Sequence, residues 1–205
     1  LGVSEKFVTG IARGATYEYK TYTVTKRTGG LRTIHHPSRR LKALQRWLLI
    51  NVIETLPVHP SAMAYRKGLS ILDNARLHTG CRYLLRMDLT DFFPSITEAD
   101  LRRYIGQQSS RFSGWTSKDI DVVSALVCRQ SALTIGAPSS PALSNALCYD
   151  LDVALHTLAE KRCATYSRYA DDLFFSTRER DVLREVEKDV SKAITEIEVP
   201  KNLKI

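Results

Sequence analysis

The sequence of 205 residues lacks any long apolar run and is poor in cysteine. No stretch approaches the roughly 20 apolar residues that a membrane-spanning helix needs, and no secretory signal opens the chain, so we expect no membrane partner and a cytoplasmic location. The four cysteines, Cys81, Cys128, Cys148 and Cys163, include no Cys-x-x-Cys pair. This spacing argues against a zinc site or a disulfide framework. We therefore expect buried free thiols in a reducing cytoplasm.

Acidic residues are scarce in the first two-fifths of the chain. Residues 1–80 hold 13 Lys and Arg against 4 Asp and Glu, whereas residues 81–205 hold 17 against 18. The formal net charge of +8 therefore originates in the first segment. This division of charge fits a protein whose basic segment binds a polyanion and holds it over an active site in the neutral segment. A basic surface that only keeps the protein soluble is an equally good interpretation of charge alone.

Local patterns predict a mixed α+β chain. The apolar and β-branched runs predict strands over 21–25, 31–34, 83–89 and on both sides of 170–171, with a possible last strand over 201–205. Apolar spacing and capping residues predict helices that begin at Ser38, Ser70, Thr97, Ser117 and Pro141, with a final helix over 179–198. The helix from Pro141 is expected to run without a break to about Lys161.

Tyr169-Ala170-Asp171-Asp172 lies between two of these strand-like runs, so we predict a hairpin with the acidic pair at its tip. Carboxylate oxygens are hard ligands that suit Mg²⁺. Asp88 ends the strand over 83–89, where a carboxylate is costly unless a partner or a metal meets it. A sheet that pairs this strand with the hairpin would gather three carboxylates, and such a cluster can hold two Mg²⁺ ions roughly 3.5–4 Å apart. A solvated Asp-Asp turn is the alternative for the dipeptide alone.

Two further groups of residues are candidates for binding. Arg39 and Arg40 lie at the start of a helix, where the helix dipole disfavours cations, so an external anion would relieve them. Arg66 and Lys67 form a short basic loop. A solvated surface explains both groups equally well. His78 shares a helix face with Asn74, and a lone histidine in such a place is more often structural than catalytic.

Ordered motifs cover nearly the whole chain. They are Gly29-Gly30-Leu31-Arg32-Thr33-Ile34 with Pro37-Ser38, the Leu41–Gln45 helix, Asn74-Ala75-x-x-His78, Asp88-Leu89-Thr90-Asp91-Phe92-Phe93-Pro94-Ser95-Ile96, Gly136-Ala137-Pro138-Ser139-Ser140-Pro141 leading to Asn145, and Tyr169-Ala170-Asp171-Asp172. In this order and spacing they resemble a bacterial reverse transcriptase, and most closely the retron type. The Asn-Ala-x-x-His element is similar to one found in retron enzymes and argues against the group II intron branch.

The resemblance implies an α+β right-hand polymerase with fingers and a palm. Residues 1–80, with part of 97–134, would form the fingers. Residues 81–205 would form the palm, an antiparallel sheet packed on helices that carries the catalytic carboxylates. We expect the thumb to be absent from this chain and the fragment to be inactive or poorly active on its own.

The resemblance also implies roles for individual residues. Asp88, Asp171 and Asp172 would be catalytic and, with the carbonyl of Leu89, would bind two Mg²⁺ ions, for which Mn²⁺ could substitute. Six residues would bind the incoming nucleotide: Lys26, Arg32, Asp91, Phe92, Phe93 and Gly136. Phe93 would lie under the sugar and exclude a 2′-hydroxyl, although without the resemblance it reads as an ordinary core aromatic. Six would contact the template or RNA: Arg39, Arg40, Arg66, Lys67, Pro138 and Ser139.

The implied activity is RNA-directed DNA synthesis by two-metal nucleotidyl transfer. Its partners would be dNTPs, a structured non-coding RNA template, the DNA product and an effector protein of the same anti-phage defence system. Two alternatives stay open: a non-retron defence or group II intron-like reverse transcriptase, and an RNA-binding module with a vestigial polymerase site. Ile135 departs from the pattern, since the family usually has Gln there, and we expect this either to alter fidelity or nucleotide choice or to mark a specialised defence-associated branch.

Overall fold

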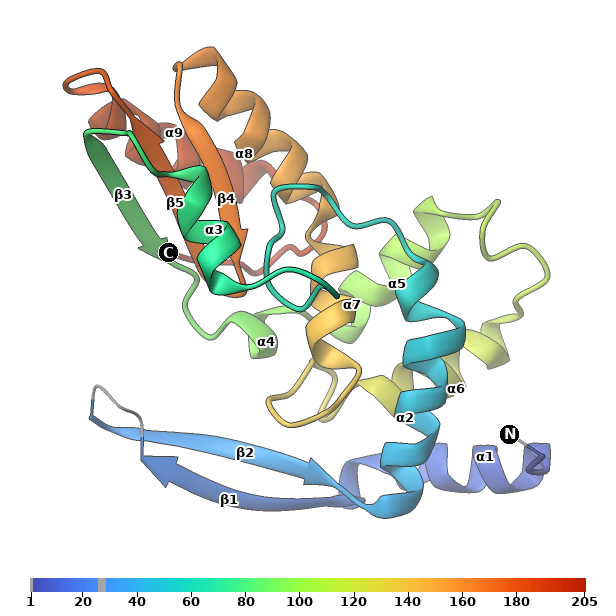
Figure 1. Ribbon diagram of the computed structural model, residues 1–205. Coiled ribbons are helices and arrows are strands. Elements are labelled where there is room, and N and C mark those ends of the chain that lie inside the picture. The colour runs from blue at the N-terminus through green and yellow to red at the C-terminus, as the bar shows by residue number, and fades with distance from the viewer. Residues whose placement is uncertain (1, 26–28) are drawn as a thin grey trace. The chain divides into compact units, whose positions relative to one another are not determined.

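The computed structural model describes residues 2–25 and 29–205 (Figure 1). The chain folds into two compact units. Unit 1 comprises residues 1–56 and 96–144, and unit 2 comprises residues 57–95 and 145–205. Each unit mixes helices with an antiparallel sheet, which confirms the predicted α+β class.

Unit 1 consists of helices and a two-stranded ribbon. Its elements are α1 (Glu5–Arg13), β1 (Tyr19–Thr25), β2 (Leu31–Pro37), α2 (Arg39–Asn51), α5 (Glu98–Gln107), α6 (Ser117–Val127) and the first part of α7 (Ser140–Leu147), with 3-10 turns over Ala15–Tyr17 and Ile53–Thr55. The ribbon, β1–β2, extends away from α1, α2 and α6 (Figure 1). β1 and β2 pair antiparallel from Tyr19 opposite Pro37 to Thr25 opposite Leu31. The two predicted strands, over 21–25 and 31–34, are therefore present and paired, and each is longer than predicted.

Capping side chains explain where these helices begin. Ser38 caps α2 as predicted, because its Oγ accepts a hydrogen bond from the Leu41 amide at 3.3 Å. Thr97 and Asp100 form a reciprocal capping box at the start of α5. The cap of α6 is Thr116, one residue before the predicted Ser117. α1, which begins at the Ser4 cap, was not predicted.

Unit 2 is built on a three-stranded antiparallel sheet with the order β3-β5-β4. Its elements are α3 (Ile71–Leu77), β3 (Tyr83–Asp88), α4 (Phe92–Ser95), α8 (Tyr149–Lys161), β4 (Thr165–Tyr169), β5 (Asp172–Thr177) and α9 (Val182–Glu196). α8 packs on β4, and α9 packs on β3 and β5. α3 also packs on β4 and lies in front of the sheet in Figure 1, with α8 and α9 behind it.

The two faces of this sheet carry different side chains. Side chains alternate between faces along a strand, and Tyr166, opposite Phe175, belongs to the face that packs on α8. Leu173 and Phe175 on this face are fully buried. The other face is that of Asp88, Asp172 and Phe174. The sheet thus has an apolar face covered by two long helices and a face on which carboxylates lie.

The structure corrects two expectations about local structure. The helix predicted from Pro141 to Lys161 is two helices, since Cys148 (φ −86°, ψ 12°) separates α7 from α8. Residues 201–205 form no strand, and Lys204 instead accepts a backbone hydrogen bond from Thr90 at 2.8 Å. Residues 57–80 belong to unit 2, so the boundary of the compact units differs from the boundary at residue 80 that we predict between fingers and palm.

Contacts between distant residues explain the last of these differences. The backbone of Ala62 forms a parallel bridge with Arg168 in β4, and Asn74 accepts a hydrogen bond from Ser167 at 2.8 Å. Such pairs cannot be inferred from local periodicity, because they join residues that are more than 90 positions apart.

The cysteines are free, as predicted, but only two of them are buried. Cys128 and Cys148 lie in the core, Cys81 is half-buried and Cys163 is exposed. Burial raises the pKa of the Cys128 thiol to about 12. Among the described helices, none combines the length and the apolar character that crossing a membrane requires.

Candidate active site

The acidic pair lies at the tip of the β4–β5 hairpin, as predicted. Tyr169 pairs with Asp172, so Ala170 and Asp171 are the two central residues of the turn. Ala170 has φ +61°, a value that two-residue hairpin turns require at this position and that usually selects glycine. The turn is therefore held in a conformation that an alanine adopts only at a cost.

The sheet brings Asp88 to this turn. Asp88 is directly opposite Asp172 in the β3–β5 register. The pairing continues one residue further, because the amide of Leu89 donates a hydrogen bond of 2.9 Å to the carbonyl of Asp171. Asp88 is exposed, and Asp171 and Asp172 are half-buried. The predicted juxtaposition of strand and hairpin is confirmed.

Arg86 is part of this arrangement and was not singled out from the sequence. Its Nε donates to Asp172 Oδ1 at 2.9 Å and its Nη2 to Asp172 Oδ2 at 3.1 Å. The hydrogen bonds and charge of Asp172, followed by the charges of Asp88 and Asp171, raise the pKa of the Arg86 guanidinium. The signal was present in the sequence, since Arg86 is two residues before Asp88 and alternation puts both on one face of β3.

The carboxylates near the hairpin have the right chemistry for Mg²⁺, but they are not arranged around a single ion position. Asp88, Asp171 and Asp172 offer carboxylate oxygens, which hard divalent cations prefer. Among residues 2–25 and 29–205, however, no group of three His, Cys, Asp or Glu side chains is arranged to hold a metal ion. The bidentate pair with Arg86 engages both oxygens of Asp172. Arg86 is thus already a cationic partner of both oxygens of Asp172.

The segment that follows β3 forms a sharp bend beside the site. Asp91 has φ +47°, and its carbonyl accepts a hydrogen bond from the Ser95 amide at 2.8 Å. Phe92 is a core residue with 4% exposure, whereas Phe93 is half-buried. The Phe93 ring centroid lies 6.4 Å from that of Tyr65. Phe93 is therefore the more accessible of the two predicted aromatic residues.

The other predicted nucleotide-binding residues belong to unit 1. Arg32 is exposed on β2, and Lys26 lies outside the described residues. Gly136 is exposed in the loop before α7, where the preceding Ile135 carbonyl accepts a hydrogen bond from the His35 amide at 2.8 Å. The backbone of Ile135 thus extends the β2 edge, although its side chain offers no polar group.

The predicted template-binding residues differ in their exposure to solvent. Arg39 and Lys67 are exposed and Pro138 is half-buried. Ser139 has no exposed surface. A contact between the template and its side chain would require this side chain to become exposed.

Two of the predicted RNA-binding arginines have partners within their own unit. The guanidinium of Arg66 donates to the carbonyls of Pro60 and Ala62, both at 3.2 Å. Arg40 pairs with Glu18. The anion that we expected near the start of α2 is thus supplied, for Arg40, by the protein itself.

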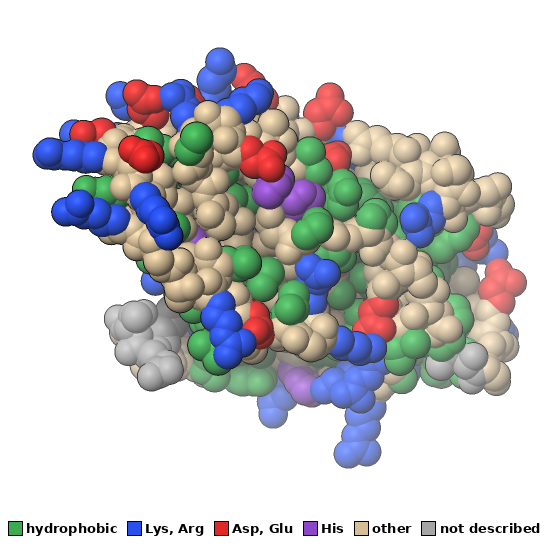
Figure 2. Space-filling model, turned by 45° about the horizontal axis from the view of Figure 1, so that its top comes forward, with side chains coloured by type: hydrophobic (Ala, Val, Ile, Leu, Met, Phe, Trp, Pro, Cys, Tyr) green, Lys and Arg blue, Asp and Glu red, His purple; other side chains and the backbone are tan. Residues whose placement is uncertain are grey.

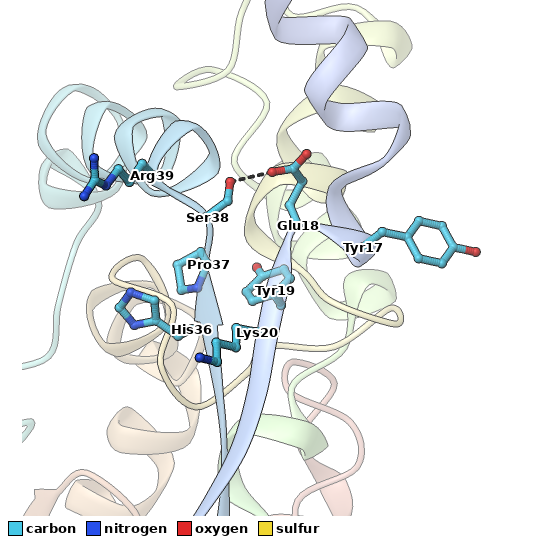
Figure 3. A pocket seen from close by; sticks show the side chains of 8 residues that line it. All are labelled: Tyr17, Glu18, Tyr19, Lys20, His36, Pro37, Ser38 and Arg39. Atoms are coloured by element: carbon cyan, nitrogen blue, oxygen red, sulfur yellow. Dashed lines mark hydrogen bonds between the residues drawn. The ribbon is translucent and has the colours of Figure 1, made fainter.

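An open pocket of about 520 Å³ lies at the start of α2 (Figure 3). Its lining comes from the beginning of β1 and the end of β2, and comprises Tyr17, Glu18, Tyr19, Lys20, His36, Pro37, Ser38 and Arg39. Ser38 donates a hydrogen bond to Glu18, while Tyr17 points away from the pocket in the same view. Lys20, His36 and Arg39 make this a basic surface once Glu18 is engaged by its partners.

His78 makes structural contacts within unit 2, as expected of a lone histidine on such a helix face. Its Nδ1 and Nε2 each lie 2.7 Å from a serine hydroxyl, of Ser176 and Ser167 respectively. Ser167 in turn donates to Asn74 at 2.8 Å. Burial lowers the pKa of His78. The Asn-Ala-x-x-His element therefore joins α3 to β4 and β5.

Comparison with known proteins first defines the fold. Over 97% of its length, the chain shares its fold with a telomerase from Candida albicans solved with a fragment of telomeric RNA (TM-score 0.56, 13% identity, 45% of that chain covered). It is similarly related to apo telomerase from Candida tropicalis (TM-score 0.54, 12% identity, 97% and 52% covered). These two similarities confirm the predicted α+β fold.

The chain belongs to the reverse transcriptase (RNA-dependent DNA polymerase) family, whose model matches residues 24–204. It is 41% identical to the retron Mx162 reverse transcriptase of Myxococcus xanthus, covering 77% of the chain and 35% of that protein. It is 40% identical to the retron Ec86 reverse transcriptase of Escherichia coli, covering 80% and 50%. The predicted retron-type relationship is confirmed. The chain spans between about a third and a half of these two relatives.

Proposed function

We propose that the protein that carries this chain is an RNA-directed DNA polymerase that copies a structured non-coding RNA. The observation that carries the proposal is the pairing of Asp88 with Asp172 across β3 and β5, with Asp171 next to Asp172 on the β4–β5 turn. Membership of the reverse transcriptase family and similarity to retron enzymes support it. Unit 2 would then be the palm, and the basic unit 1 would be the fingers.

The chemistry required of these residues is mainly placement and charge. Asp88 and Asp171 would hold divalent ions, with Mg²⁺ as the expected ion and Mn²⁺ as a substitute. Bound ions of this kind would activate the primer 3′-hydroxyl and stabilise the leaving pyrophosphate. Asp172 would support the site through its pair with Arg86, and Phe93 would stand against the sugar of the incoming dNTP.

A role in anti-phage defence, together with an effector protein, is the finer part of the proposal. It is supported only by the similarity to retron reverse transcriptases. Sequencing the nucleic acid that copurifies with the full-length protein tests this part, because copying of one structured RNA predicts that this RNA and its DNA copy are enriched. A mixed population of unrelated RNAs would instead favour a non-retron reverse transcriptase.

Metal-dependent incorporation of labelled dNTPs by the full-length protein that carries this chain tests the enzymatic proposal. We expect Asp171→Ala to reduce incorporation by roughly a hundredfold or more, since a charged group at the reacting centre is lost. Asp150→Ala is the matched control, because Asp150 is an exposed aspartate of the same unit and should leave the rate unchanged. If the wild-type protein incorporates no dNTP with any copurified RNA, the polymerase proposal is rejected, and an RNA-binding module becomes the better account.

A further inference from the structure

A buried ion pair lies under the acidic hairpin, on the opposite face of the sheet. Arg168 in β4 and Asp152 in α8 both have side chains with 0% exposure. Arg168 Nε donates to Asp152 Oδ1 at 2.8 Å, and Nη2 donates to Oδ2 at 2.7 Å. Removing two charges from water costs so much that such pairs are often no more stabilising than apolar residues of the same volume. Stability alone therefore does not account for this pair.

The remaining guanidinium nitrogen points to another role. Arg168 Nη1 donates to the carbonyl of Ala170 at 3.1 Å. Ala170 is the turn residue with φ +61°, and Asp171 follows it directly. Strained backbone of this kind persists only where the surroundings hold it. Arg168 supplies such a hold from beneath, while the Leu89 amide holds the Asp171 carbonyl from the side of β3.

Arg168 is itself fixed by its backbone. Its amide donates to the Ser61 carbonyl at 2.7 Å, and its carbonyl accepts from the Met63 amide at 2.8 Å. These bonds join the outer edge of β4 to residues 61–63. The guanidinium carbon also lies 5.9 Å from the centroid of the Phe92 ring. One side chain thus contacts both the hairpin and the segment that follows β3.

Asp152 is held just as firmly. It lies in the first turn of α8 and accepts a further hydrogen bond of 2.8 Å from the hydroxyl of Tyr166. Burial on its own would lower the pKa of Arg168, but the charge and hydrogen bonds of Asp152 outweigh it and raise that pKa, so the guanidinium stays charged. The Arg168 guanidinium is thus a charged group that is held in a fixed position by Asp152.

We propose that Arg168, oriented by Asp152, is a positioning residue for the acidic hairpin, which fixes the Ala170 carbonyl and thereby the direction in which Asp171 is presented. This inference deepens the proposed function and rests on it for its catalytic meaning. Its structural content, that the turn geometry depends on this guanidinium, can be measured without any polymerase assay.

The first test uses the 205-residue chain and the exchange rate of the Leu89 amide hydrogen, which reports on the turn through its bond to Asp171. Arg168→Lys keeps the charge, but a single ammonium cannot bond both carboxylate oxygens and the Ala170 carbonyl in the fixed fork geometry of arginine. We expect Leu89 to exchange roughly tenfold faster through local opening. Arg162→Lys is the matched control, since Arg162 also donates two hydrogen bonds to one carboxylate, that of Asp189. It should leave Leu89 unchanged.

A second variant separates positioning from stability. Replacing the three buried polar partners together, with Tyr166→Phe, Asp152→Leu and Arg168→Met, leaves no unpaired charge, and such replacements often retain stability. We expect a melting temperature close to that of the wild type, faster exchange at Leu89, and a loss of roughly tenfold in affinity for Mn²⁺, the loss typical when a supporting residue of a metal site is removed.

The outcomes are decisive in each direction. Native-like exchange at Leu89 in either folded variant overturns the positioning role, as does the failure of both variants to fold, which would mark the pair as core structure only. If the wild-type chain shows no Asp171-dependent Mn²⁺ binding while Leu89 still responds to Arg168→Lys, the polymerase site is rejected and the anchoring of the turn stands.

Discussion

Gly136 lies where the loop before α7 crosses the backbone of β2. Its φ is +110°, and a Cβ atom at this position would lie 2.5 Å from the carbonyl oxygen of His35. Only a glycine satisfies both conditions, because other residues rarely adopt this φ and the obstructing atom belongs to the backbone. The glycine of the Gly-Ala-Pro motif is thus required for the close approach of two segments of unit 1, whatever it contacts in a bound nucleotide.

Gly136→Ala should therefore destabilise the protein. We expect a loss of about 2 kcal/mol or more, from the strained φ and from overpacking against His35. Thermal unfolding measures it, at roughly 2–4 °C for each kcal/mol in a chain of this size. Gly10→Ala is the control, since Gly10 lies within α1 with no atom near its missing Cβ and should stabilise slightly. Equal melting temperatures for Gly136→Ala and the wild type would contradict the steric argument.

At the scale of elements, two helices of unit 1 begin with the same motif in different surroundings. Asp100 accepts hydrogen bonds from the Thr97 amide and hydroxyl at 2.8 and 2.7 Å, and Asp119 accepts from those of Thr116 at 2.8 and 2.6 Å. Asp100 has only 1% of its surface exposed, whereas Asp119 is exposed. The two capping boxes have nearly the same geometry and differ in access to water.

This difference predicts unequal costs of removal. Asp100→Ala should lower the free energy of unfolding by about 2 kcal/mol, because the cap is lost and buried donors are left unsatisfied. Asp119→Ala should cost clearly less, since water can replace the lost hydrogen bonds. Urea unfolding of the two variants, compared by midpoint at constant slope, makes the measurement. A larger effect at Asp119 would show that burial does not control the strength of these caps.

At the scale of the whole molecule, the two units differ in charge. With the boundaries of the compact units, unit 1 holds 15 Lys and Arg against 7 Asp and Glu, and unit 2 holds 15 against 15. The entire net charge of +8 thus belongs to unit 1. Figure 2 shows Lys and Arg side chains (blue) spread over one face of the molecule, with Asp and Glu (red) between them. The proposed fingers would therefore supply the attraction for a polyanion.

The affinity for RNA should therefore fall as the salt concentration rises, and the cations of unit 1 should cause this dependence. Lys20 is exposed at the pocket of Figure 3, and Lys188 is exposed on α9 in the neutral unit. We expect Lys20→Glu to weaken the binding of single-stranded RNA and to reduce the slope of log affinity against log salt by about 0.7 for each phosphate that the variant no longer neutralises. Lys188→Glu should leave the slope unchanged. Fluorescence anisotropy over a series of salt concentrations distinguishes the two, and equal slopes would reject the assignment of RNA binding to this surface.

Most of the helices and strands, and the position of the acidic pair at a hairpin tip, could be predicted from the sequence. Helix starts at Ser38 and Thr97 follow from hydrogen bonds within four residues, and the hairpin at Asp171 follows from alternation on both sides of it. The order of the motifs also identified the family. These features are readable because each depends on neighbours in the chain or on residue types in a fixed order.

The contacts around the acidic hairpin could not be predicted, because they form between residues that are distant in the sequence. The pairs Arg86–Asp172 and Arg168–Asp152 depend on strand register and on the packing of α8, and the need for glycine at Gly136 depends on a crossing with β2. The break at Cys148 likewise interrupts a periodic pattern that continues on both sides of it. Long-range pairings of this kind are set by the free energy of the whole packed arrangement, which no local pattern contains.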